Sequence, residues 1–146
     1  MDPNIEKLRD VLKNNEDAVK GYGKAAENAS EIGLKSYFQN KSKERLNFIT
    51  SLRGALPHMD MGTGEIDGST TGAVHRTWMD VKAFFSSGND EAMLEEAIKG
   101  DRAAVSDYEK ILGDGNLPPA AEEMIRQQMK WIKNDITEIK TMEDVR

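Results

Sequence analysis

The spacing of the apolar residues constrains the fold of this chain more than any other feature. These residues recur at steps of three and four over four long segments, at about residues 3–28, 30–56, 90–112 and 118–142. This period is typical of an amphipathic helix that turns one face toward a core. At 1.5 Å per residue, helices of about 23 to 27 residues would each be roughly 35 to 40 Å long. Four helices of similar length predict an all-α four-helix bundle.

The connections between the segments predict the topology. The first two segments, and likewise the last two, are separated by a few residues only, so each pair is expected to form an antiparallel hairpin. Residues 57–89, which begin with the glycine-rich stretch "PHMDMGTGEIDGSTTG", separate the two hairpins. This crossover is long enough to travel the length of the bundle, and a short helix is expected within it at about 70–85. One long crossover between two hairpins is the connectivity of ferritin-like bundles, so we predict a single ferritin-like domain over residues 1–146.

Charge and composition restrict the classes of function. The formal net charge is -6 and basic residues alternate with acidic ones, so no basic stripe is available for phosphates and nucleic acid is not an expected partner. The chain has no cysteine, which removes thiolate nucleophiles and thiolate metal sites. No apolar run approaches the roughly 18 residues of a membrane span, and "MDPNIEKLRD" lacks the regions of a secretory signal. We therefore expect a cytoplasmic protein that has no membrane partner.

Polar residues interrupt the apolar stripes near the middle of each helix. They are Asn15, Lys41, Glu44, Arg45, Asp101 and Gln128, with Asn134 and Asp135 a turn further on. Antiparallel helices of similar length bring their midpoints together, so these side chains are expected to meet at one height. We interpret them as a hydrogen-bonded polar layer that sets the register of the helices. A pocket for a small ligand beside this layer is an alternative.

In di-iron carboxylate bundles the same height holds the metal ions. Their ligands are a Glu on each of two helices and a Glu-x-x-His motif on each of the other two. In this chain Glu44 is followed three residues later by Asn47, and Gln128 by Trp131. The second residue of the motif is therefore not a histidine in either helix, and amide side chains are poor ligands for Fe²⁺.

The charges of the polar layer also oppose a metal. Lys41 and Arg45 bring positive charge to the height at which a divalent cation would bind. We therefore expect no metal and no cofactor. The alternative is a ferritin-like oxidase or metal-storage protein. In such a protein, Glu44 and Asp101 would be the carboxylates that bridge the metal ions.

The crossover carries the most unusual segment of the chain, "GAVHRTWMDVKAFF" at residues 72–85. It holds His75, Arg76, Trp78 and Asp80, with Arg76 and Asp80 spaced i, i+4 for an ion pair. No nucleophile with an acid, a base and an oxyanion-binding group accompanies His75, so no catalytic residue is expected. We interpret Trp78 as a plug in the side of the bundle, with His75 and Arg76 tying the crossover to the helix ends.

The stretch "TTGAVHRTWMDVKAFF", followed by "GNDEAMLEEAIKGDRAAVSDYEKIL", resembles a family of uncharacterised bacterial ferritin-like four-helix-bundle proteins. Its members carry a similar Gly-x-x-His-Arg-x-Trp-x-Asp-x-Lys segment before the third helix. The resemblance covers nearly the whole chain and implies the fold, but no activity. We therefore expect a non-enzymatic protein with a structural, stress-associated or interaction role, although the biological process is not defined.

A second apolar row on the first helix bears on self-association. Val11, Ala18 and Ala25 form this row outside the main stripe, and a row of that kind can pair with a symmetric copy of the chain. Because the side chains are small, we expect a monomer or a weak homodimer.

Overall fold

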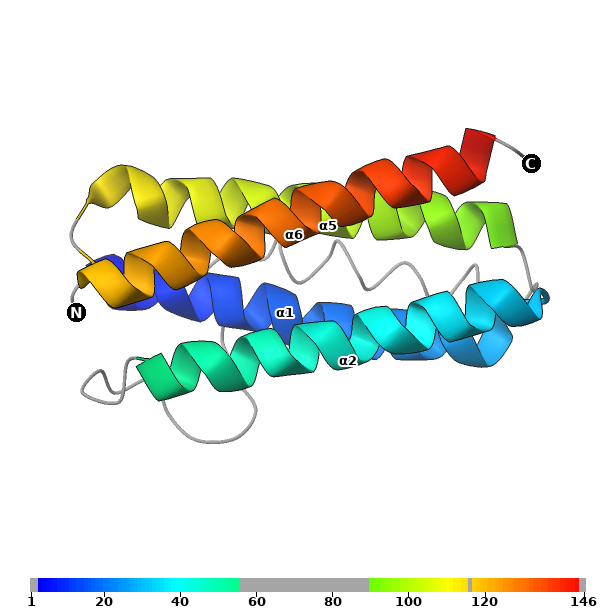
Figure 1. Ribbon diagram of the computed structural model, residues 1–146, viewed down its shortest axis with the longest axis horizontal. Coiled ribbons are helices and arrows are strands. Elements are labelled where there is room, and N and C mark those ends of the chain that lie inside the picture. The colour runs from blue at the N-terminus through cyan, green and yellow to red at the C-terminus, as the bar shows by residue number, and fades with distance from the viewer. Residues whose placement is uncertain (1–2, 56–89, 116, 145–146) are drawn as a thin grey trace.

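The computed structural model describes residues 3–55, 90–115 and 117–144. Within these ranges it contains four helices and no strand (Figure 1), which confirms the prediction of an all-α chain with four long helices. The helices are α1 (Pro3–Asn28), α2 (Ile32–Ala55), α5 (Asp90–Asp114) and α6 (Pro119–Asp144). The observed helix ends lie within two residues of the predicted ones. The predicted crossover at 57–89 and its short helix at about 70–85 lie outside the described residues.

Local sequence explains the sharp connection between α5 and α6. Gly115 follows the last residue of α5 with a φ of 68°, a left-handed conformation that glycine adopts without the clash of a Cβ atom. Pro119 then occupies the first position of α6, where the missing N–H costs no helical hydrogen bond and the fixed φ suits a helix. These residues end one helix and begin the next within a few positions.

Polar contacts at the two ends of the bundle fix the relative direction of the helices. The Asp90 carboxylate at the start of α5 accepts hydrogen bonds from the backbone N–H groups of Ser30, at 2.8 Å, and Glu31, at 3.3 Å, between α1 and α2. At the opposite end of the bundle, Lys7 near the start of α1 pairs with Asp114 at the end of α5. α1 and α5 are therefore antiparallel, and α5 begins at the end of the bundle where α2 also begins (Figure 1).

The helices pack as two pairs. α1 packs closely against α2, and α5 against α6, while α1 and α5 join the two pairs. Of these four helix–helix contacts, the one between α2 and α6 is the least extensive. The bundle therefore has one loosely closed side, between α2 and α6.

The apolar core consists of two clusters along the bundle. One lies around Tyr22, Phe38 and Leu94, and the other around Leu12, Leu52 and Ile125. On three helices a buried charged residue stands between the clusters: Arg45 on α2, Asp101 on α5 and Asp135 on α6. A layer of charge thus divides the core.

The prediction of an outer apolar row on α1 is wrong. Val11 and Ala18 have no exposed surface and Ala25 is 4% exposed, and all three belong to the core clusters. This row lies inside the bundle because α1 contacts both α2 and α5. It therefore gives no support to a dimer.

α1 also buries polar residues that its sequence pattern did not single out. Lys13 and Asp17, one turn apart, form an ion pair at 3.3 Å, and their side chains are only 8% and 7% exposed. Asn14 beside them has no exposed surface, and neither atom of its amide has a hydrogen-bond partner. These residues lie beside the apolar stripe and do not interrupt it, so the stripe gives no sign of their burial.

Candidate functional site

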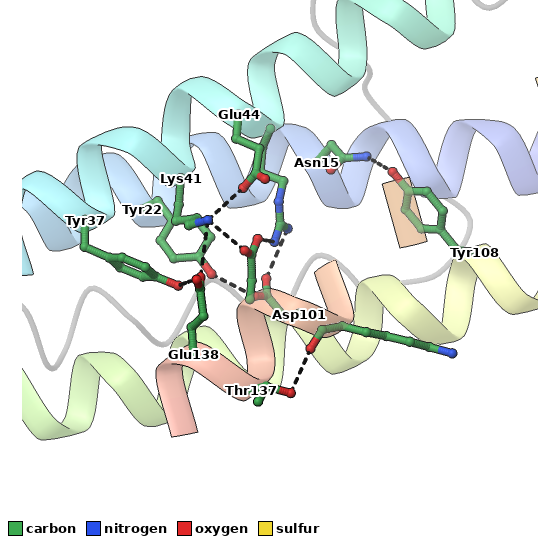
Figure 2. Close-up of polar contacts among 12 residues, drawn as sticks. Asn15, Tyr22, Tyr37, Lys41, Glu44, Asp101, Tyr108, Thr137 and Glu138 are labelled. Atoms are coloured by element: carbon green, nitrogen blue, oxygen red, sulfur yellow. Dashed lines mark hydrogen bonds and ion pairs between the residues drawn. The ribbon is translucent and has the colours of Figure 1, made fainter. Parts of the chain in front are cut away.

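Five charged side chains from three helices meet between the two core clusters. They are Lys41, Glu44 and Arg45 on α2, Asp101 on α5 and Asp135 on α6, and we call them the ion-pair layer. Figure 2 shows the side chains of this layer converging on the bundle interior from facing helices. Lys41 and Arg45 lie on one face of α2 because they are four residues apart.

Arg45 is the centre of the layer. Its guanidinium lies between two carboxylates, with Nη1 3.1 Å from Asp101 and Nη2 donating a hydrogen bond of 3.0 Å to Asp135. The side chains of Arg45 and Asp101 have no exposed surface, and that of Asp135 is 1% exposed. Burial by itself lowers the pKa of Arg45, but Asp101 and then Asp135 raise it above its usual value. The guanidinium is thus a permanent cation in the core.

Lys41 extends the layer toward the surface. Its Nζ donates a hydrogen bond of 2.7 Å to Asp135 and lies 3.4 Å from Glu44 and 3.7 Å from Glu138. Asp135 therefore accepts from both cations, one at each oxygen. Burial has the largest single effect and lowers the pKa of Lys41, but the hydrogen bond to Asp135 and the charges of Asp135, Glu44 and Glu138 together outweigh it, so the net pKa is raised.

Aromatic rings surround the two cations. The Arg45 guanidinium lies 5.6 Å from the centre of the Tyr22 ring and 5.8 Å from that of Phe48, and the Lys41 Nζ lies 5.1 Å from that of Tyr37. Ring faces attract cations at these distances. The Tyr22 hydroxyl also donates a hydrogen bond of 2.8 Å to Asp101. Burial, followed by the charge of Asp101, raises the pKa of Tyr22 well above its usual value, so this hydroxyl remains a donor.

Glu44 shares the Lys41 cation, which lies 3.4 Å from it, with Asp135. Arg45 and Lys41 balance Asp101 and Asp135, which leaves Glu44 as the fifth charge of the layer. Burial and then the nearby Asp135 raise the pKa of Glu44 from 4.5 to about 7. At neutral pH, Glu44 therefore exchanges a proton in an otherwise balanced cluster.

A second polar layer lies two helical turns away. The Tyr108 hydroxyl accepts a hydrogen bond of 2.9 Å from Asn15 and donates one of 2.6 Å to Gln128. Burial raises the pKa of Tyr108 as well. We call these three residues the tyrosine layer.

The two layers repeat with a spacing of seven residues on three helices. The pairs are Asn15 and Tyr22 on α1, Tyr108 and Asp101 on α5, and Gln128 and Asp135 on α6. Seven residues of helix span roughly 10.5 Å. Residues seven positions apart on a helix face the same partner helix. Both layers therefore lie between the same helices.

The polar residues predicted from the sequence thus fall into two groups. Lys41, Glu44, Arg45 and Asp101 come together in the ion-pair layer, and Asn15 and Gln128 come together in the tyrosine layer. Asn134 is exposed and belongs to neither. The four crossover residues, His75, Arg76, Trp78 and Asp80, lie outside the described residues.

The tyrosines were missed as members of the site. Tyr22 and Tyr108 fit the apolar stripes of their helices, so the pattern gave no sign of their hydroxyl contacts. Asp135 stands between Ile132 and Ile139 at steps of three and four, and this spacing is the signal that places it, and not Asn134, toward the core.

In the ion-pair layer, Asp101 and Asp135 lie against the cations Arg45 and Lys41. Within residues 3–55, 90–115 and 117–144, no three or more Asp, Glu or His side chains are arranged to hold a metal ion. The hydroxyls nearest the cations belong to tyrosines whose pKa values are raised, which makes them poor nucleophiles at neutral pH. None of the described helices combines the length and the apolar character needed to cross a membrane.

Four long helices around a core divided by buried ion pairs define the protein as an all-α four-helix bundle. The chain belongs to the family described as a domain of unknown function, DUF2383, whose model matches residues 4–114. The match includes nearly all of α1 and the whole of α2 and α5, and ends before α6. No curated protein and no solved structure matches the chain. The family description assigns no activity.

Proposed function

We propose that this protein is a ferritin-like bundle in which ion pairs have replaced the metal centre, and that it acts as a non-enzymatic structural or interaction protein. The directions of the helices support the ferritin-like connectivity. α1 and α2 form one antiparallel hairpin and α5 and α6 the other (Figure 1). The Asp90 carboxylate lies beside Ser30, so α5 starts at the end of the bundle opposite to the end of α2. This placement of the described helices agrees with two hairpins joined by one long connection.

The residues of the ion-pair layer do not fit a di-metal centre. A guanidinium has only donors and offers no lone pair to a metal, yet that of Arg45 lies at the centre of the layer. Lys41 adds a second cation beside Asp135. Asn47, three residues after Glu44, is exposed. A divalent cation would face two positive charges and would lack the histidine ligands of the ferritin-like motif.

One observation carries the proposal: the buried guanidinium of Arg45 contacts Asp101 of α5 and Asp135 of α6 at once. A buried ion pair adds little net stability compared with apolar residues of the same volume. It does restrict the helices to the one register in which every charge has a partner. We therefore propose that the ion-pair layer makes α2 pack against α5 and α6 in the correct register.

A metal titration tests this assignment. Purified protein is dialysed against chelator, and its melting temperature is measured with increasing Fe²⁺, Mn²⁺ or Zn²⁺, together with the mass of the native protein. We expect no saturable rise in melting temperature and no stoichiometric metal. A saturable rise of several degrees that is lost in both Glu44→Gln and Asp101→Asn would contradict the proposal and favour a ferritin-like oxidase.

A matched control separates specific binding from surface binding. Glu109 is an exposed carboxylate on α5, the same helix as Asp101, so Glu109→Gln removes a charge without changing the layer. A metal effect that persists equally in Glu109→Gln, Glu44→Gln and Asp101→Asn arises on the surface, which agrees with the proposal.

A further inference from the structure

The loosely closed side of the bundle contains a groove between α2 and α6. Its volume is about 420 Å³, and its lining includes Phe48 of α2 and Ala120, Glu123, Met124, Gln128 and Trp131 of α6. Pockets of roughly 300 to 1,000 Å³ accommodate small organic ligands. α6, which supplies most of the lining, lies outside the residues matched by the family model.

The floor of the groove is held in place by the tyrosine layer. The Gln128 amide accepts a hydrogen bond of 2.6 Å from Tyr108 and donates one of 3.3 Å to the backbone carbonyl of Phe48. Gln128 is 4% exposed, so its main partners are inside the protein. A floor anchored in this way exists before any ligand binds, which lowers the entropic cost of binding.

Apolar and aromatic side chains line part of the groove, beside the polar Ser51 and Gln127. Trp131 is 52% exposed, although tryptophan is usually highly buried. Phe48 and Met124 beside it are half-buried, and Ala120 has too small a side chain to fill the space near the start of α6. An exposed indole with apolar neighbours can stack against a flat apolar body or attract a cation to its face.

Among the described residues that line the groove, only Glu123 carries a charge. It lies eight residues before Trp131, which is roughly 12 Å along the helix. The groove therefore presents an aromatic surface at one end and a carboxylate toward the other. A ligand that contacts both residues has an apolar ring system joined to a positively charged nitrogen by a flexible chain.

We propose that the α2–α6 groove binds a small amphipathic organic cation, with its ring against Trp131 and Met124 and its amine toward Glu123. This site is independent of the ion-pair layer and of the absence of metal proposed above. All residues of this site lie on α2 and α6 of one chain, so binding requires no partner chain.

Two probes of nearly the same size and opposite charge test the proposal: 4-phenylbutylamine and 4-phenylbutyrate. The chain has two tryptophans, so the experiment uses a Trp78→Phe background in which Trp131 is the only indole, after its fold has been checked by circular dichroism. We expect the amine to change Trp131 fluorescence saturably and to bind at least about tenfold more tightly than the carboxylate. Equal affinity for both probes, or no saturable change with the amine, would overturn the proposal.

Two substitutions and a control locate the binding. Glu123→Gln should weaken amine binding about three- to fivefold, the range expected for a partly exposed ion pair, while leaving the carboxylate probe unweakened. Ala120→Leu, on an exposed position of α6, should fill the groove and weaken amine binding at least about tenfold. Glu122→Gln removes the same charge from the neighbouring residue, which pairs with Arg126, and should have no effect. Equal effects of Glu122→Gln and Glu123→Gln, or normal binding in Ala120→Leu, would show that the amine does not occupy the groove.

Discussion

The Arg45 guanidinium and the Asp101 carboxylate lie 3.1 Å apart, and neither side chain has exposed surface. Arg45 Nη1 and Asp101 Oδ1 attract each other by charge, but neither atom makes a hydrogen bond of good geometry. The desolvation of the two groups is therefore offset by this attraction and by the hydrogen bonds that each group makes elsewhere, Asp101 with Tyr22 and Arg45 with Asp135. The pair is consequently sensitive to the loss of one partner, even though it adds little net stability.

Asp101→Asn is expected to destabilise the metal-free protein by about 3 kcal/mol or more. Burial raises the pKa of Asp101 against the opposing effect of Arg45, and this favours a neutral side chain. The larger effect is that Arg45 loses one of its two carboxylates and cannot release its proton. Urea unfolding at pH 7 measures the change, with Glu109→Gln as the surface control. A stabilising effect of Asp101→Asn would mean that desolvation of the carboxylate dominates the layer.

Glu44→Gln is expected to change how stability depends on pH. The folded-state pKa of Glu44 is about 7, above its usual 4.5. The stability that the protonated group contributes is therefore complete below about pH 4.5 and is lost as the pH rises to about 7. Glutamine mimics the neutral form at every pH. The variant should match the unmodified protein near pH 4.5 and exceed it at pH 8, by up to about 3 kcal/mol.

Urea unfolding between pH 4.5 and pH 8 checks this difference. Glu95 is an exposed carboxylate on α5, and Glu95→Gln controls for the loss of one negative charge from the chain. A difference between Glu44→Gln and the unmodified protein that stays constant with pH would show that Glu44 does not titrate in this window.

Tyr108→Phe tests the tyrosine layer. Removing the hydroxyl takes one hydrogen bond from each of the buried amides of Asn15 and Gln128, which keep their bonds to backbone carbonyls. Each buried polar atom that loses its partner in this way costs about 1 to 3 kcal/mol. Tyr37→Phe is the matched control, because its hydroxyl contacts Glu138 at an exposed position. Tyr108→Phe should cost clearly more in urea unfolding than Tyr37→Phe. Equal costs would indicate that water replaces the lost hydroxyl.

The four helices follow from the sequence because their apolar stripes and end signals act locally. The stripe of α6 continues through Ile132 and Ile139, and Gly115 marks the end of α5. Both signals are independent of what the helix packs against. The presence of polar residues in the core was predictable for the same reason, since a charged residue such as Arg45 or Asp101 interrupts a stripe visibly.

The division of the polar residues into two layers could not be predicted in this way. It depends on which side chains meet across helices, and therefore on the axial register of the bundle. Tyrosine hydroxyls decide it: Tyr108 bridges Asn15 and Gln128, while Tyr22 joins Asp101. Both tyrosines fit the spacing of the apolar residues because their rings pack in the core. This spacing does not predict which partner the hydroxyl at the end of each ring contacts.

Replacing the buried charges with apolar residues separates stability from register. In the triple variant Arg45→Met, Asp101→Leu, Asp135→Leu no buried guanidinium or carboxylate is left unpaired, and Lys41 and Glu44 can still pair with each other at 3.4 Å. Such replacements are often neutral or stabilising by about 1 to 4 kcal/mol. We therefore expect the triple variant to be at least as stable as the unmodified protein, and clearly more stable than Asp101→Asn. If the layer sets the register, the triple variant should also lose uniqueness, with broadened amide resonances and faster hydrogen exchange in α2 and α6. A single well-dispersed NMR spectrum with unchanged exchange would show that apolar packing alone aligns the helices, and would leave the ion-pair layer without its proposed role.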